Sequence, residues 1–239
     1  MKETVWDKYW KKQQEIKLEN ITRTLALLKD FEDYHLNAVF LDLFLPTLSF
    51  AKRNADNNKI IADFVLAYGF RLPFSDETFD IVWNEGVNEH FEGEQRQKIF
   101  DEMARVCVTG GKMIVIAPNA LNLPYRITKK ILELRNQWIY GFEKTYTIFE
   151  QKRRMRNAGI TPSKSSGAQI IISLLTFLEL IHSEASPKKK ENVKTLEQTT
   201  SRSKIKRLLE VIMKIDEHLE VVFGTLLGKD IGIKGGKRC

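Results

Sequence analysis

The stretch LPFSDETFDIVWNEGVNEHFEGEQRQKIFDEMARVCVTGGKMIVIAPN, residues 72–119, decides the fold of this chain. Apolar runs at residues 81–84 and 112–117 predict two strands, and residues 94–106 between them predict a helix. The glycine pair at 110–111 predicts the turn into the second strand. A strand, a helix and another strand in this order are typical of a parallel sheet covered by helices.

The same alternation extends toward the N-terminus. Residues 38–43, AVFLDL, lie between Asn37 and Pro46 and have the composition of a buried parallel strand. Residues 47–57 then predict a helix, and residues 64–67 predict the next strand. The expected fold class is therefore α/β, with a doubly wound, mostly parallel, Rossmann-like sheet and extra helices in the N- and C-terminal parts.

Bulk composition narrows the class of protein. The chain has 239 residues, which suits one sizeable α/β domain with appendages. Cys107 and Cys239 are the only cysteines, so neither a disulfide framework nor a paired-cysteine metal site is expected, and a reducing cytoplasm is the expected location. The N-terminus carries charges where a signal peptide needs an apolar core. The longest apolar stretch, residues 170–181, is too short to span a membrane, for which roughly 20 residues are needed.

The pattern along the chain predicts four parts. They are an N-terminal helical segment (1–36), an α/β core with an insertion at about 120–150 (37–182), a polar basic linker (183–204), and a C-terminal helix with a last strand at 231–234 (205–239). The net charge is +7, and basic residues crowd 188–207. Such a run is a solvated linker or a surface for an anionic partner. Peripheral membrane contact stays open, whereas no nucleic-acid-binding motif is present.

Residues 37–160, with the last strand, resemble the class I S-adenosylmethionine-dependent methyltransferases of the small-molecule type. In that family the pattern LPF.D..FD.V leads into the fourth strand, and EM.RV...GGK joins a helix to the fifth. The resemblance implies that S-adenosylmethionine is the cofactor and that the insertion faces the acceptor. It also implies methyl transfer to an unidentified small or lipid-like acceptor.

The chain departs from that family at the glycine-rich loop after the first strand. This loop needs glycine because its backbone approaches the cofactor closely, beside the N-terminus of a helix. The first glycine here is Gly69, and the residues before Asn37 leave no room for the first strand, its loop and its helix. Tyr68 also stands where the family commonly has an aspartate. The alternative to an active enzyme is therefore a catalytically inactive methyltransferase-like protein that serves as a binding or scaffold subunit.

The resemblance also assigns candidate site residues. Asp42 matches the acid that accepts hydrogen bonds from both ribose hydroxyls, although an acid at this place can equally cap a helix. The Glu89–His90 pair matches a family motif and supplies the candidate catalytic residues, while a structural role is the alternative for the histidine. No metal site is expected. The candidate cofactor contacts are Asp42, Leu43, Tyr68, Gly69, Asn84, Glu85 and Gly86.

The missing first strand leads to a prediction about the sheet. In the intact family this strand lies between the second and the fourth, and its loss would leave unpaired backbone groups inside the sheet. Residues 39–43 are therefore predicted to pair directly with residues 81–84, with residues 64–67 on their other side. All these strands, together with residues 112–117, are expected to be parallel.

Overall fold

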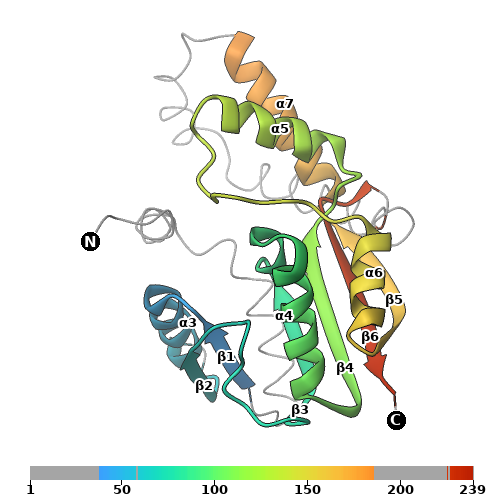
Figure 1. Ribbon diagram of the computed structural model, residues 1–239. Helices are drawn as coiled ribbons and strands as arrows, with labels where there is room; N and C mark the ends of the chain where they lie inside the picture. The colour runs from blue at the N-terminus through green and yellow to red at the C-terminus, as the bar shows by residue number, and fades with distance from the viewer. Residues whose placement is uncertain (1–37, 58, 186–224, 226, 239) are drawn as a thin grey trace. The chain divides into compact units, whose positions relative to one another are not determined.

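The computed structural model describes residues 38–57, 59–185, 225 and 227–238 (Figure 1). The chain divides into two compact units, of which the first ends at Ser75 and also includes Ile139–Gly141. The second comprises Asp76–Trp138 and Phe142–Cys239. The predicted N-terminal helical segment and most of the predicted basic linker and C-terminal helix lie outside the described residues.

The first unit contains a strand, a helix and a strand: β1 (Ala38–Asp42), α3 (Leu45–Asn57) and β2 (Ala62–Leu66). The two strands are parallel, with Ala38 opposite Ala62 and Asp42 opposite Leu66. The rings of Phe40 and Phe64 stack on this small sheet with their centroids 5.4 Å apart. The predicted order of elements is confirmed here, and the helix begins two residues earlier than predicted.

The second unit is built on a four-stranded sheet in the order β3-β4-β6-β5. β3 and β4 are parallel, whereas β6 lies antiparallel to both β4 and β5. The strands are β3 (Phe79–Glu85), β4 (Cys107–Pro118), β5 (Ile160–Ala168) and β6 (Asp230–Lys237). The predicted last strand is therefore confirmed as β6. It brings the C-terminal part of the chain into the interior of the sheet, beside β4.

Helices complete the second unit (Figure 1). They are the short 3-10 helix η1 (Asn88–His90), α4 (Gly93–Val106), α5 (Leu123–Leu134), α6 (Ile148–Asn157) and α7 (Ile170–Ala185). α4 and α6 lie side by side on one face of the sheet, and α5 and α7 pack against each other beyond the carboxyl end of β4. The core between sheet and helices is fully buried around Phe100, Val115, Met155 and Ile233.

The predicted direction of the strands is confirmed for both pairs, β1 with β2 and β3 with β4. The predicted direct pairing of residues 39–43 with 81–84 is wrong for the described residues, because β1 and β3 belong to different sheets. That prediction assumed that only these two strands were available to fill the place of the lost one. Residues 1–37 lie outside the described part of the chain, so the structure gives that assumption no support.

Candidate functional site

Polar side chains gather at one edge of the four-stranded sheet. The carboxyl ends of β3 and β4 meet there because the two strands are parallel, and ligands bind at this edge in open α/β sheets. β6 is antiparallel and therefore begins at the same edge, where Asp230 lies opposite Pro118. Beyond the end of β4, the Asn119 amide donates to the carbonyl of Lys229 at 2.7 Å. The topology thus unites residues that are more than a hundred positions apart.

The end of β3 carries the predicted Asn84 and Glu85, and the turn after it carries Gly86, Glu89 and His90. Gly86 has a φ of +73°, a conformation that glycine adopts without strain. A Cβ built on it would lie 3.9 Å from Oε1 of Glu89, so this carboxyl packs against the backbone of the turn. The Asn84 amide donates to the side chain of Asn88 at 3.5 Å, whereas its own oxygen is buried without a hydrogen-bond partner in the described structure.

Residues 142–146 of the predicted insertion, called the covering segment below, are hydrogen-bonded to this turn and to the end of β4. The Lys144 amide donates to the carbonyl of Glu89 at 2.9 Å, and the amide of Tyr146 donates to the carbonyl of Pro118 at 2.8 Å. Nδ1 of His90 lies 2.7 Å from the carbonyl oxygen of Phe142, to which it donates. This hydrogen bond gives His90 a structural task, and its role in catalysis stays a prediction.

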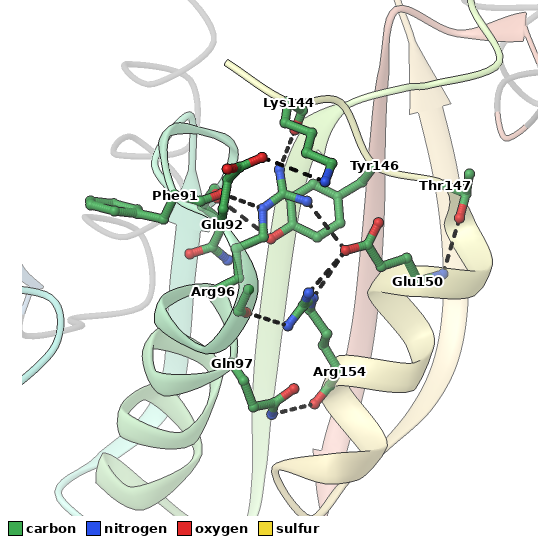
Figure 2. A network of polar contacts seen from close by, with 11 residues as sticks. Phe91, Glu92, Arg96, Gln97, Lys144, Tyr146, Thr147, Glu150 and Arg154 are labelled. Atoms are coloured by element: carbon green, nitrogen blue, oxygen red, sulfur yellow. Dashed lines mark hydrogen bonds and ion pairs between the residues drawn. The ribbon is translucent and has the colours of Figure 1, made fainter. Parts of the chain in front are cut away.

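Arg96 of α4 is hydrogen-bonded to the backbone of the covering segment (Figure 2). Its side chain is only 1% exposed, and Nε donates to the carbonyl of Phe91 at 2.6 Å. A second nitrogen donates to the carbonyl of Lys144, and a third lies 3.2 Å from Oε1 of Glu150. The guanidinium also stacks on Tyr146, 3.8 Å from the ring centroid. One buried cation therefore joins α4, α6 and the segment that covers the turn.

Residues of α6 add further hydrogen bonds to this network. Arg154 of α6 donates to Oε1 of Glu150 at 3.1 Å, so Glu150 lies between two arginines (Figure 2). The side-chain amide of Gln97 donates in turn to the carbonyl of Arg154 at 3.1 Å. These contacts hold α4 against α6 over more than one helical turn.

Glu89 supplies a buried carboxyl at this edge. Its side chain is 4% exposed, and Oε2 has no hydrogen-bond partner in the described structure. Burial raises the pKa of Glu89, the hydrogen bond to its own backbone amide lowers it, the nearby carboxylates of Glu143 and Asp230 raise it and Arg96 lowers it, with a net value of about 8. The carboxyl is therefore protonated and uncharged at neutral pH.

Aromatic and acidic side chains from α5 and the insertion adjoin Glu89. The hydroxyl of Tyr125 donates to both carboxylate oxygens of Glu143, at 2.7 and 2.8 Å. Nζ of Lys129 lies 3.2 Å from Oε1 of the same carboxylate and 5.3 Å from the ring centroid of Trp138. Burial and the two nearby acids Glu143 and Asp230 raise the pKa of Tyr125 far above its usual value, so its phenol stays protonated.

The remaining predicted site residues belong to the first unit. Asp42 ends β1, and its Oδ1 accepts a hydrogen bond from the amide of Phe44 at 2.7 Å. Burial raises the pKa of Asp42, and its hydrogen bonds to the backbone amides of Phe44 and Leu43 oppose this effect. Leu43 and Tyr68 are exposed, and a side chain at Gly69 would meet no atom within 4 Å.

Sequence reasoning missed Arg96, Tyr125, Glu143 and Asp230. No local motif marks them, because their relation to the turn arises from the antiparallel placement of β6 and from the path of residues 142–146. The one local signal is Asn122, which lies two residues before Pro124. Asn122 caps α5 by accepting a hydrogen bond from the Tyr125 amide at 2.8 Å.

Comparison with known proteins agrees with this architecture. Residues 22–115 match the methyltransferase domain family. This match covers less than half of the chain. The match begins ahead of β1, at residues outside the described part of the chain. An uncharacterised protein of Methanocaldococcus jannaschii is 31% identical over 128 residues, which cover 51% of this chain and 50% of the relative. The chain thus spans about half the length of that curated relative.

Solved methyltransferases share the fold. One is a Galdieria sulphuraria protein provisionally assigned as a sarcosine dimethylglycine methyltransferase, with a TM-score of 0.53 and 14% identity, over 87% of this chain and 72% of that chain. Another is a geranyl diphosphate methyltransferase in complex with S-adenosylmethionine, with a TM-score of 0.52 and 14% identity, over 88% and 73% of the two chains. At this identity the likeness establishes the fold alone.

The residues present fit part of S-adenosylmethionine. Asp42 offers the paired acceptor oxygens that two ribose hydroxyls need, with one of them also bonded to Phe44. At the end of β3, the left-handed glycine Gly86 and the unpartnered oxygen of Asn84 are features of a backbone that approaches a ligand. The amino-acid end of the cofactor finds no glycine loop, because no glycine precedes Gly69.

Two further kinds of site receive no support. None of the helices that the structure describes is long and apolar enough to cross a membrane. In the same part of the chain, no group of His, Cys, Asp and Glu side chains has the arrangement of a metal site.

Proposed function

We propose that the chain is an S-adenosylmethionine-dependent methyltransferase whose acceptor is a small or lipid-like molecule bound at the carboxyl edge of β3 and β4. The observation that carries this proposal is the buried, uncharged carboxyl of Glu89, with an oxygen that no described group satisfies. Leaving a buried polar group unpaired costs about 1–3 kcal/mol. Perturbed groups of this kind concentrate at functional sites.

Asp42, at the end of β1, is the candidate contact for the ribose hydroxyls of the cofactor. Asn84, Glu85 and Gly86, at the end of β3, are the further candidate cofactor contacts. The cofactor supplies an activated methyl group, so the protein needs to orient the acceptor rather than to generate a nucleophile by covalent catalysis. The acidic and aromatic side chains beyond the turn, from Tyr125 to Glu143, would orient the acceptor.

A second candidate function rests on the same departure from the family as before. No glycine precedes Gly69, and Tyr68 replaces the common aspartate with a side chain that cannot accept hydrogen bonds in the same way. Both changes favour a chain that keeps the fold and binds a ligand or partner without methyl transfer. The substrate-facing residues would then serve recognition alone.

Calorimetric titration of the purified chain with S-adenosylmethionine and S-adenosylhomocysteine separates the two functions. Charge-assisted contacts are worth about 1.5–3 kcal/mol each. Losing two of them weakens binding by roughly a hundredfold to ten-thousandfold, so we expect a dissociation constant weaker than about 1 µM. Asp42→Asn should weaken it further, and Asp56→Asn, an exposed carboxylate of the same unit, should not.

The outcomes have distinct meanings. Measurable binding that Asp42→Asn weakens supports the methyltransferase, and transfer of a labelled methyl group to an acceptor panel would then complete the test. No binding at millimolar cofactor supports the scaffold instead. A dissociation constant at or below the micromolar range would show that the absent glycine loop is not needed for cofactor binding by this chain.

A further inference from the structure

Helix α5 leaves a row of large apolar side chains exposed to solvent. Leu123, Ile127 and Leu134 are between 44% and 73% exposed. Their spacing of four and seven residues brings them to one side of the helix. Another side of α5 is occupied within the unit, because the buried Lys129 contacts Glu143. The packing of α5 in the described structure therefore leaves this apolar row uncovered.

Helix α7 carries a second row of the same kind. Leu174, Leu178 and Ile181 are about half exposed, and their spacing of four and three residues again brings them to one side of a helix. The buried Ser173 meets α5, where its hydroxyl accepts a hydrogen bond from Asn122 at 2.9 Å, and the two helices pack against each other (Figure 1). Single exposed apolar side chains are ordinary, whereas rows on two helices in contact indicate a binding surface.

Cations flank the apolar row of α5. Arg126 and Lys130 are exposed and lie one turn apart on the same border of the row. Nη1 of Arg126 donates to the carbonyl of Ala120 at 3.2 Å, and Nζ of Lys130 lies 3.8 Å from a carboxylate oxygen of Glu133. Arg135, which is also exposed, follows the last residue of the helix. These three cations outnumber the one acid of α5, so positive charge prevails beside the row.

The charges on and after α7 agree with those of α5. Glu179 is exposed, but its position five residues after Leu174 places it about 140° round the helix and outside the apolar row. In the sequence after α7, basic residues crowd 188–207. Lys and Arg beside an amphipathic helix attract anionic lipid headgroups. A surface of negative charge is therefore the partner that the electrostatics favour.

The length of α7 limits how this helix can meet a bilayer. Its 16 residues are about 24 Å long, which is less than the roughly 30 Å of hydrocarbon that a spanning helix crosses. A helix with one apolar side and cations beside it lies instead in the plane of the membrane surface. Its apolar side chains then reach the acyl chains while the cations stay among the headgroups.

We propose that α5 and α7 bind the surface of an anionic lipid bilayer, with their two apolar rows inserted between headgroups and acyl chains. The inference goes beyond the proposed function, because it concerns where the chain attaches and does not depend on the cofactor. Nucleic acid would engage the cations and leave the apolar rows without a partner. A second copy of the chain, paired through the same faces, would bring like charges together.

Co-sedimentation of the purified full chain with lipid vesicles, in the absence of cofactor, tests the inference. Vesicles of phosphatidylcholine alone are compared with vesicles of equal parts phosphatidylcholine and phosphatidylglycerol. We expect binding to the anionic vesicles, little binding to the neutral ones, and weaker binding as the salt concentration rises. Equal binding to both kinds of vesicle, or binding to neither, overturns the inference.

A double variant of α7 tests whether the apolar row inserts. Leu174→Gln with Leu178→Gln should weaken partition into anionic vesicles at least about tenfold, because two half-exposed leucines no longer leave water. The control is Ile61→Gln with Leu66→Gln, which makes the same kind of change at exposed positions of the first unit. This control should bind as the parent does.

A second pair of variants tests the charges. Arg126→Gln with Lys130→Gln should weaken partition about thirtyfold, at roughly fivefold for each cation removed. Lys98→Gln with Arg153→Gln removes the same charge from exposed positions on α4 and α6 and should have a much smaller effect. Because all these side chains are exposed, the variants should keep the circular dichroism and the thermal midpoint of the parent.

Each other outcome has a definite meaning. Vesicle binding that survives both the α7 and the α5 variants originates elsewhere in the chain and overturns the inference. A lower thermal midpoint of the α7 variant, together with a parent that ignores vesicles, shows that the apolar rows are covered by protein and also overturns it. Vesicle binding that depends on α5 and α7, in a chain that binds no S-adenosylmethionine, supports this inference and removes only the proposed methyltransferase.

Discussion

Replacing Glu89 by Gln should stabilise the folded chain above pH 5, although it deletes an ionisable group from the candidate site. The unfolded chain releases the Glu89 proton near its ordinary pKa of 4.5, whereas the folded chain keeps it until a pH of about 8. Between these values the folded state binds one proton more than the unfolded state. The free energy of unfolding therefore falls as pH rises, by about 1.4 kcal/mol per pH unit.

The magnitude follows from the two pKa values. At pH 7 the free energy of unfolding of the wild-type chain should be about 3 kcal/mol lower than at a pH at which Glu89 is protonated in both the folded and the unfolded state. Gln has nearly the same shape and carries no proton to lose, so Glu89→Gln should escape this loss. The stability difference between variant and wild type should grow by about 3 kcal/mol between pH 5 and pH 7.5.

Urea unfolding followed by tryptophan fluorescence and circular dichroism at several pH values measures this difference. Glu94→Gln is the control, because its carboxyl is exposed and should leave the pH dependence of the wild type unchanged. Unfolding curves of Glu89→Gln that stay parallel to those of wild type across this range would refute the reasoning. They would show that Glu89 ionises in the folded chain at an ordinary pH, through water or movement of the turn.

Two further substitutions test the frame around the site. Arg96→Met should destabilise the chain by about 3–5 kcal/mol in urea unfolding, because it leaves the carbonyls of Phe91 and Lys144 without this donor and removes one of the two arginines at Glu150, while the exposed Arg153→Met should change little. Gly235→Ala should cost about 1–3 kcal/mol or lower the soluble yield, because its Cβ would lie 2.5 Å from Ile160 and 2.8 Å from Met155. At Gly236 in the same strand the nearest atom is the mobile Nζ of Lys112 at 3.4 Å, so Gly236→Ala should be close to neutral by thermal unfolding.

The strands that the sequence predicts well are those with a continuous apolar run. Residues 38–42 and 112–117 carry apolar runs, and each lies in a strand of a parallel pair. The turn predicted at Gly110 and Gly111 is wrong, because β4 begins at Cys107 and includes both glycines, with a shift in its register against β3. β5 was not predicted, because ITPSKSSGA has no apolar run or strict alternation. It pairs only with β6, at the edge of the sheet, where one row of hydrogen bonds and two buried ends are sufficient. Edge strands of this kind leave little trace in hydrophobic periodicity.

Some residues of the candidate site could be predicted from the sequence, and others could not. Asn84 to His90 could be found from sequence because the turn follows directly from a predicted strand and matches a local family pattern. Glu143 and Asp230 could not, since each lies in a stretch without a motif, and only the fold brings them to Glu89. Asp230 in particular owes its place to the antiparallel β6, whose first residue lies at the same edge as the last residues of β4.

Glu89 is buried in a part of the fold whose backbone is held by several hydrogen bonds. Its carbonyl is held by the amide of Lys144, and Arg96 holds the carbonyl of the same lysine from α4. The adjacent Tyr146 is tied to Pro118 at the end of β4 and lies under the guanidinium of Arg96. Because these bonds fix the backbone on both sides, Glu89 cannot reach water by a small local movement. A movement that exposes Glu89 must therefore break several of these hydrogen bonds at once, which agrees with a carboxyl that keeps its proton up to a pH of about 8.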